Sequence, residues 1–248
     1  MLRRYPLIWI LLLALTGGCH EPSWESPPPA QSSSDAPVTE ELDFLQQTKA
    51  VREQRSDSIR VSARAVSDEE FSSLTGLSGL HHLILNQGRI SDESLVVCKS
   101  LTALEHLRLR KSTVSDEGIA HLAAHPTLKI LNLPQADLTD QSLKLLSQLP
   151  RLEYLRLASP QVTDKGLDHL TRLSTLRFLH LIDVNITDKG LQHVTRMEEL
   201  ESFYLDGSQA TEEGLTQLIK ARPDLHLHLN QQHLDHDPQK HQHSTESK

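Results

Sequence analysis

Apolar and polar positions repeat with a period of 24 residues through most of the chain. The period begins with a leucine in six successive copies, at Leu80, Leu104, Leu128, Leu152, Leu176 and Leu200. If Leu104 is position 1, apolar residues recur at positions 1, 4, 6, 11, 16 and 19. A fixed period without insertions predicts a solenoid of stacked repeats, in which each repeat contacts only its neighbours.

Each repeat contains two spacings, and each spacing predicts one element. Positions 4 and 6, such as Leu107 and Leu109, alternate as the residues of a short β-strand do. Positions 16 and 19, such as Ile119 and Leu122, have helical spacing. Stacked copies of this unit bury their apolar sides together, with strands about 4.8 Å apart. We therefore expect an α/β fold with a parallel sheet on one face and short helices on the other.

The repeat domain is predicted to span residues 56–230, as about seven repeats and a terminal strand. Its first copy, residues 56–79, is degenerate because Ser56 replaces the leading leucine, although the later apolar positions keep register. The terminal strand is expected around Leu225 and Leu229.

The open ends of a solenoid need covers. Residues 39–55 carry Leu42, Leu45 and Val51 among charged residues, after Thr39. This pattern favours a short amphipathic capping helix with Thr39 as its N-cap.

A hydroxyl residue and then an acidic residue occupy positions 12 and 13 of every copy, from Ser67-Asp68 to Thr211-Glu212. The hydroxyl suits a helix N-cap, and the carboxylate suits the positive end of the helix dipole. A calcium-binding ladder of stacked carboxylates is the alternative. A small residue, such as Gly166, usually follows at position 15 and indicates close packing of successive turns.

The Leu-x-x-Leu-x-Leu pattern resembles the leucine-rich repeat family over about 70% of the chain. The run Thr163-Asp164-Lys165-Gly166-Leu167 resembles the 24-residue "T-D-x-G-L" variant of bacterial extracytoplasmic proteins, which is similar to the cysteine-containing subclass. The asparagine that usually follows the strand is absent. The resemblance implies a horseshoe with its sheet on the concave face, where ligands usually bind.

The first 18 residues resemble a bacterial export signal. Arg3 and Arg4 precede an apolar run from Leu7 to Leu15, which is too short for a comfortable bilayer span. Small residues then precede Cys19, as in a lipobox, although Thr16 stands where a leucine is usual. We expect Cys19 to be the lipidated mature N-terminus, with ordinary secretion and an uncleaved anchor as alternatives. Residues 19–38 are rich in Pro and Ser and predict a flexible tether.

Composition and the lack of catalytic motifs argue against two classes of function, nucleic-acid binding and catalysis. The chain has 248 residues, a net charge of −8 and no basic run, which argues against nucleic acid as a partner. No nucleophile elbow, phosphate loop or paired-cysteine motif occurs, so we expect neither an enzyme nor a cofactor. Cys98 takes a core position equivalent to Leu122 and is interpreted as a buried thiol. We expect a monomer.

The outward positions 3, 5 and 7 of the strands are the candidate site. They gather aromatic and arginine side chains, which are common at interface hot spots. The predicted binding residues are His106, Arg108, Tyr154, Arg156, Phe178, His180 and Tyr204. They predict a protein or peptide partner on the sheet, whereas cross-strand packing alone is the alternative explanation.

The histidines permit a second reading. His226 and His228 share one strand face, and the tail at 231–248, which we expect to be disordered, adds four more. A metal-handling surface lipoprotein that uses this His-rich end is therefore an alternative function, and a structural envelope element without a specific ligand is another. Other histidines, such as His121 and His125, are interpreted as surface residues.

Overall fold

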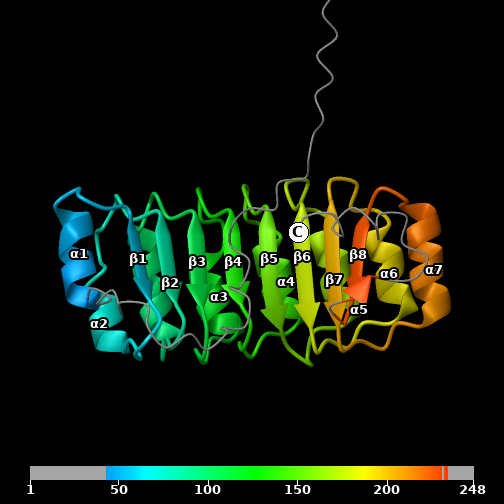
Figure 1. The fold of residues 1–248 in the computed structure, drawn as a ribbon, viewed down its shortest axis with the longest axis horizontal. Coiled ribbons are helices and arrows are strands. Elements are labelled where there is room, and N and C mark those ends of the chain that lie inside the picture. Colours follow the sequence, from blue (N-terminus) through cyan, green and yellow to red (C-terminus); the bar gives the residue numbers. More distant parts are fainter. Residues whose placement is uncertain (1–42, 231, 234–248) are drawn as a thin grey trace, which may run out of the picture. The chain divides into compact units, whose positions relative to one another are not determined.

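The computed structural model describes residues 43–230 and 232–233. The predicted signal peptide, Cys19 and the predicted tether lie outside the described residues. Within this part the chain alternates strands and helices from end to end (Figure 1). The strands are β1 (Ser58–Val61), β2 (His82–Leu85), β3 (His106–Leu109), β4 (Ile130–Leu133), β5 (Tyr154–Ala158), β6 (Phe178–Ile182), β7 (Ser202–Asp206), β8 (His226–Leu229) and β9 (Gln232–His233).

Helix α1 precedes the first strand at one end of the sheet, and the later helices alternate with the strands and cover one face of the sheet (Figure 1). They are α1 (Phe44–Arg52), α2 (Asp68–Ser72), the 3₁₀ helix η1 (Glu93–Ser100), α3 (Asp116–Leu122), α4 (Asp140–Leu146), α5 (Asp164–Leu170), α6 (Asp188–Val194) and α7 (Glu212–Ala221). None of these described helices is long and apolar enough to cross a membrane.

One sheet runs through all the repeats. Strands β1 to β8 are parallel and lie in chain order, and each residue pairs with the residue one period later, as Leu83 does with Leu107. Paired residues on neighbouring strands are therefore one 24-residue period apart, which confirms the α/β solenoid. β9 was not expected: it adds an antiparallel strand to β8, inside the tail that we predicted to be disordered. Residues 231 and 234–248 lie outside the described residues.

The core lies between the sheet and the helices. The six leading leucines are at most 1% exposed, and positions 4 and 6 of the strands face inward. The degenerate first copy contributes too, since Ile59 and Phe71 are fully buried. Cys98 is also fully buried, and burial raises the pKa of its thiol to about 12, as expected for an inert core residue. The prediction for His125 was wrong: it is 5% exposed, and its Nε2 lies 3.2 Å from the Cys98 carbonyl oxygen.

The capping helix α1 exists, but its details differ from the prediction. It begins after Asp43, which forms a capping box with Gln46, whereas Thr39 lies outside the described residues. Phe44 and Val51 are buried, but Leu45 is 55% exposed, so its predicted place on the apolar face was wrong. The face that packs on the first repeat is thus set by Phe44 instead.

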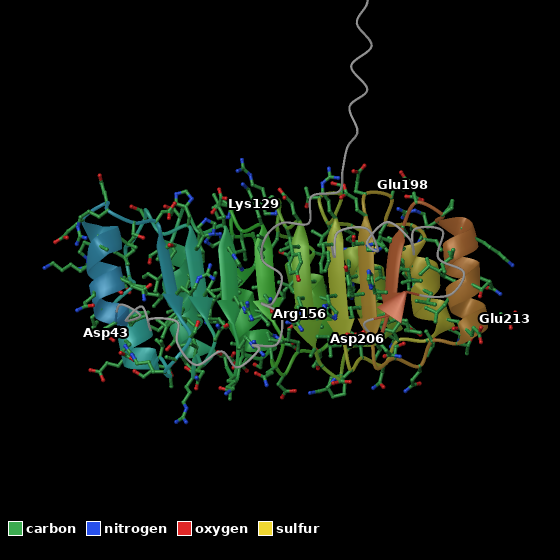
Figure 2. All side chains as sticks on the ribbon, viewed as in Figure 1. Asp43, Lys129, Arg156, Glu198, Asp206 and Glu213 are labelled. Atoms are coloured by element: carbon green, nitrogen blue, oxygen red, sulfur yellow. The ribbon has the colours of Figure 1, made fainter. Side chains whose placement is uncertain are left out.

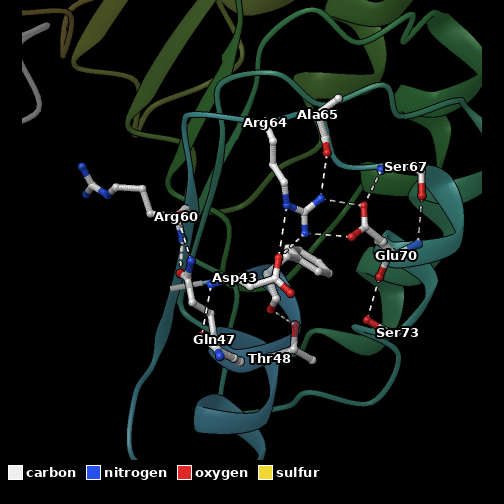
Figure 3. Close-up of polar contacts among 11 residues, drawn as sticks. Asp43, Gln47, Thr48, Arg60, Arg64, Ala65, Ser67, Glu70 and Ser73 are labelled. Carbon is white, nitrogen blue, oxygen red and sulfur yellow. Dashed lines mark hydrogen bonds and ion pairs between the residues drawn. The ribbon is translucent and has the colours of Figure 1, made fainter. Parts of the chain in front are cut away.

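Arg64 fastens this cap to the first repeat. Its guanidinium donates to Asp43 at the start of α1 and to Glu70 in α2 (Figure 3). These hydrogen bonds raise the pKa of Arg64 and lower the pKa values of both carboxyl groups. The network explains how a short helix stays attached at the end of the stack.

The predicted hydroxyl caps are confirmed in six of the seven copies. The capping residues, whose side chains accept a backbone N–H of the first turn, are Ser67, Ser115, Thr139, Thr163, Thr187 and Thr211. The exception is Ser91, because η1 begins after Asp92 and shows no side-chain cap. The adjacent Val96 and Val97 are poor helix formers, which is consistent with the irregular turn there.

The acidic residue that follows the cap does more than the dipole argument predicts. In six copies its carboxylate reaches the next repeat and accepts the backbone N–H of the hydroxyl residue at position 12 there, at 2.8–3.0 Å. Asp164, for example, also accepts the Thr187 hydroxyl at 2.7 Å. A ladder of carboxylates therefore ties each repeat to the next. Since its oxygens already accept hydrogen bonds from the protein, the ladder has a structural explanation without calcium.

The ladder also explains position 15. A Cβ added to Gly166 would lie 2.7 Å from Oδ1 of Asp140, which belongs to the preceding repeat. Where a serine replaces this glycine, its hydroxyl donates to the same carboxylate, as Ser142 does to Asp116. The close packing predicted for successive turns is thus confirmed, and it leaves room for a carboxylate.

Candidate functional site

The candidate site is the outer face of the sheet, which we define by positions 3, 5 and 7 of the strands. Because positions 4 and 6 point into the core, these side chains point away from it. Position 3 comes first in each strand, as Tyr154 does in β5, and position 5 follows two residues later, as Arg156 does. Parallel pairing aligns equal positions in rows across the sheet.

An aromatic stack occupies the β5–β8 half of this face. Tyr154 stacks on Phe178 with ring centroids 4.3 Å apart, and Phe178 lies 4.8 Å from Tyr204 on the next strand. Tyr204 in turn stacks on His228 at 4.1 Å, with nearly parallel planes. The predicted residues Tyr154, Phe178 and Tyr204 are therefore brought together, and His228 extends the stack.

Tyr154 is more enclosed than the sequence suggested. Only 5% of its surface is exposed, so the expectation of an exposed ring was wrong. The reason is its place in the row between Ile130 and Phe178, its partners in register on β4 and β6. Burial also raises the pKa of the Tyr154 hydroxyl.

Three polar residues form a chain beside the stack. Arg156 Nε donates to His180 Nδ1 at 3.2 Å, and His180 Nε2 lies 3.0 Å from Asp206 Oδ2. Because Nδ1 accepts, these contacts assign the neutral Nε2–H tautomer to His180. Burial lowers the pKa of His180 despite the opposing hydrogen bond to Asp206, which agrees with a neutral ring. Figure 2 labels Arg156 and Asp206, the two ends of this chain.

Arg108 lies apart from this cluster, two strands away on β3. Burial lowers its pKa, and the charges of Arg110 and Arg156 lower it further. Burial likewise lowers the pKa of Arg156. Asn132, directly between Arg108 and Arg156 in register, is 8% exposed and was not predicted as a site residue. Its polarity at an outward strand position was the one signal that could have identified it.

His106 is the first residue of β3 and lies on the same face of the sheet as Arg108, two residues later. Its ring makes an edge contact with His82, with centroids 6.0 Å apart. Burial, and then the charges of His82 and Arg108, lower the pKa of His106 to about 4. His106 is therefore neutral at physiological pH and does not touch the aromatic stack.

The histidine pair at the end of the sheet has a defined geometry. His226 and His228 place their Nε2 atoms 3.0 Å apart, and their rings meet edge to face. In the described part of the chain, no group of three or more His, Cys, Asp or Glu side chains could hold a metal ion. The metal-handling alternative thus has two candidate ligands here, and the tail histidines lie outside the described residues except in β9.

Comparison with known proteins supports the fold. No family model and no curated protein matches the chain. Among solved structures it is similar to internalin C2 of Listeria monocytogenes, at 22% identity and a TM-score of 0.50, over 70% of this chain and 80% of that one. It is also similar to a second Listeria monocytogenes internalin, inlF, at 20% identity and a TM-score of 0.54, over 79% of this chain and 61% of that one.

The fold is a leucine-rich repeat solenoid. Identities of this size establish the architecture and no more. A leucine-rich repeat protein of Leptospira interrogans also matches, at 16% identity and a TM-score of 0.46 over 73% of this chain and 50% of that one. The aromatic stack and the arginines of the outer sheet face are the features of this chain that the repeat itself does not require.

Proposed function

We propose that the protein is an exported, lipid-anchored interaction module that binds a protein or peptide partner on the outer face of its sheet. It acts by binding and not by catalysis. The supporting observation is the aromatic stack, in which the rings of Tyr154, Phe178 and Tyr204 are held by one another. Tyr is among the residues that dominate interface energies.

Pre-organisation is the physical reason why this stack suits binding. An aromatic side chain that is already packed loses little rotamer freedom when a partner arrives. The cross-strand alternative explains ring–ring packing, but it gives no reason for arginine and histidine beside the rings. Arg156, fixed by His180, adds a planar donor next to the stack.

The anchor is the second component of the proposal. Cys19 follows an apolar run and small residues, and residues 19–38 then separate it from the folded repeats along the chain. A lipidated Cys19 with this tether would keep the sheet accessible above a membrane. The envelope location follows from this assignment.

The decisive experiment is partner capture by the full chain from an envelope extract. The variant Tyr154→Ala with Phe178→Ala should lose the partner, while circular dichroism shows an intact fold. The matched control is Lys165→Ala with Lys189→Ala, two exposed residues of α5 and α6 on the helical side. If the control loses the partner and the sheet variant keeps it, the outer sheet face is not the binding surface.

A further inference from the structure

Positive charge without negative charge collects on one half of the outer sheet face. The outward positions of β1–β5 hold four arginines and no aspartate or glutamate, in a chain of net charge −8. The arginines are Arg60, Arg108, Arg110 and Arg156. Within the described residues none of the four forms an ion pair. This half of the face is therefore complementary to an anion.

Two of these arginines are partly buried, so an uncompensated positive charge there costs desolvation free energy. Arg108 and Arg156 are only partly exposed, and Nε of Arg108 is buried without a hydrogen-bond partner. Taking a cation out of water stabilises a protein only when an anion or acceptor compensates it. Arg156 is compensated in part, by the acceptor His180 and the more distant Asp206, whereas Arg108 has no ion pair with the described residues.

Asn132 lies between the two arginines and has its own unmet requirement. It pairs in register with Arg108 on one side and Arg156 on the other. The residue is 8% exposed, and its side-chain oxygen is buried without a hydrogen-bond partner. The two arginine strands are about 9.6 Å apart, since each step in a sheet is about 4.8 Å. A small planar anion fits above the short Asn132 side chain between the two long ones.

Arg156 is held in place for this role. Asp206 orients His180, and His180 Nδ1 accepts from Arg156 Nε at 3.2 Å. The two terminal nitrogens of Arg156 make no hydrogen bond with the described residues and stay available as a pair of donors. Such a fork matches the two oxygens of a carboxylate.

We propose that β3–β5 hold a carboxylate of an acidic, extended peptide between Arg108 and Arg156, above Asn132. This inference rests on the proposed function and names the chemistry of the partner. A peptide is favoured over a bare phosphate, because the aromatic stack next to Arg156 can contact an apolar side chain and phosphate has none. The neighbouring Phe178 ring, which is partly exposed and packs on Tyr154, then contacts an apolar side chain of the same peptide. The carboxylate comes from a glutamate or aspartate side chain or from a free C-terminus.

The test is fluorescence anisotropy with the full chain and four labelled probe peptides. One carries glutamate at alternate positions between apolar residues, with both ends blocked; the second replaces glutamate with glutamine. The third is the glutamine peptide with a free C-terminal carboxylate, and the fourth is the blocked peptide with lysine instead. We expect the glutamate peptide to bind at least about tenfold more tightly than the glutamine peptide, and the lysine peptide not to bind. Binding of the third peptide would assign the C-terminus as the source of the carboxylate.

Variants locate the site and separate this inference from the proposed function. Arg108→Gln with Arg156→Gln should abolish binding of the glutamate peptide, whereas Lys165→Gln with Lys189→Gln, which removes the same charge from the helical side, should leave it unchanged. The inference is overturned if the glutamate and glutamine peptides bind equally and the third peptide binds no more tightly than they do, or if the arginine variant keeps its binding. So does stronger competition by inorganic phosphate than by the glutamate peptide. If the envelope partner is still captured by the arginine variant but lost with Tyr154→Ala and Phe178→Ala, the proposed function stands and only the acidic peptide fails.

Discussion

The carboxylate ladder gives the sharpest test of how the repeats hold together, and Asp116 is its best probe. Its Oδ1 accepts the backbone N–H groups of Thr139 at 3.0 Å and of Ser142 at 3.1 Å. Its Oδ2 accepts the Thr139 hydroxyl at 2.5 Å, and the Ser142 hydroxyl donates to Oδ1. Asp116→Ala removes one side chain of α3 and leaves four donors of α4 without this acceptor.

The expected cost exceeds that of losing a dipole partner. A hydrogen bond to a charged group contributes about 1.5–3 kcal/mol, and an unsatisfied buried donor costs about 1–3 kcal/mol. Because the site is partly exposed, water replaces some of these contacts, and we expect Asp116→Ala to lower the free energy of unfolding by about 2–4 kcal/mol. A dipole contact alone would be worth about 0.3–1 kcal/mol.

Urea and thermal unfolding, followed by circular dichroism, measure this difference. Glu117→Ala is the matched control, since Glu117 has the same charge, lies in the same first turn and is exposed. Burial would raise the pKa of Asp116, but the hydrogen bonds from Ser142 and Thr139 outweigh it, so the pKa is lowered. The stabilisation is therefore present at neutral pH and is lost as the pH falls below about 3.8. If Asp116→Ala costs no more than Glu117→Ala at neutral pH, the ladder does not hold the repeats together.

Four further outcomes are expected. Leu155→Ala, at a fully buried position of β5, should cost about 2–5 kcal/mol in the same melts. His106→Asn should remove an acid destabilisation of about 2 kcal/mol at pH 5, because the folded pKa of about 4 lies below the ordinary 6.5 and the unfolded chain therefore takes up the proton first as the pH falls. Arg108→Gln should leave the melting temperature unchanged or raise it, since a partly buried cation near Arg110 and Arg156 is removed. Cys19→Ser should release the protein from membranes and abolish lipid labelling, and unchanged fractionation would end the lipoprotein assignment.

Much of the fold could be predicted because the repeat makes local pattern and tertiary position equivalent. A leucine at position 4 or 6 meets its own equivalent on the next strand, so Leu107, Leu131 and Leu155 pair in register without any long-range information. The hydroxyl caps followed from local chemistry for the same reason. Where the pattern weakened, at Ser91 and Leu45, the prediction was wrong, because a 3₁₀ turn and the rotation of a terminal helix depend on packing.

The role of the aspartates was harder to predict from the sequence, because each aspartate accepts hydrogen bonds from the next repeat. A serine or threonine before an aspartate is sufficient evidence for a cap and a dipole contact within one helix. Only the superposed turns reveal that Asp140 lies against Gly166 and accepts the N–H of Thr163. The clue was present in the sequence as the small residue at position 15. It has meaning only once the first turns of consecutive helices are seen to pack against each other.

The polar residues of the solenoid fall into two groups: those that join successive repeats and those that the repeat does not require. Asp116 and Asp164 are polar residues whose acceptors are matched by donors of the next repeat, so the solenoid explains them completely. Arg108 and Asn132 occupy outward positions where the repeat demands nothing, and each has a buried atom without a hydrogen-bond partner. Natural proteins satisfy buried polar groups, and exceptions tend to occur at functional sites. The outer face of β3–β5 is such an exception, and a ligand carboxylate would compensate the charge of its partly exposed arginines.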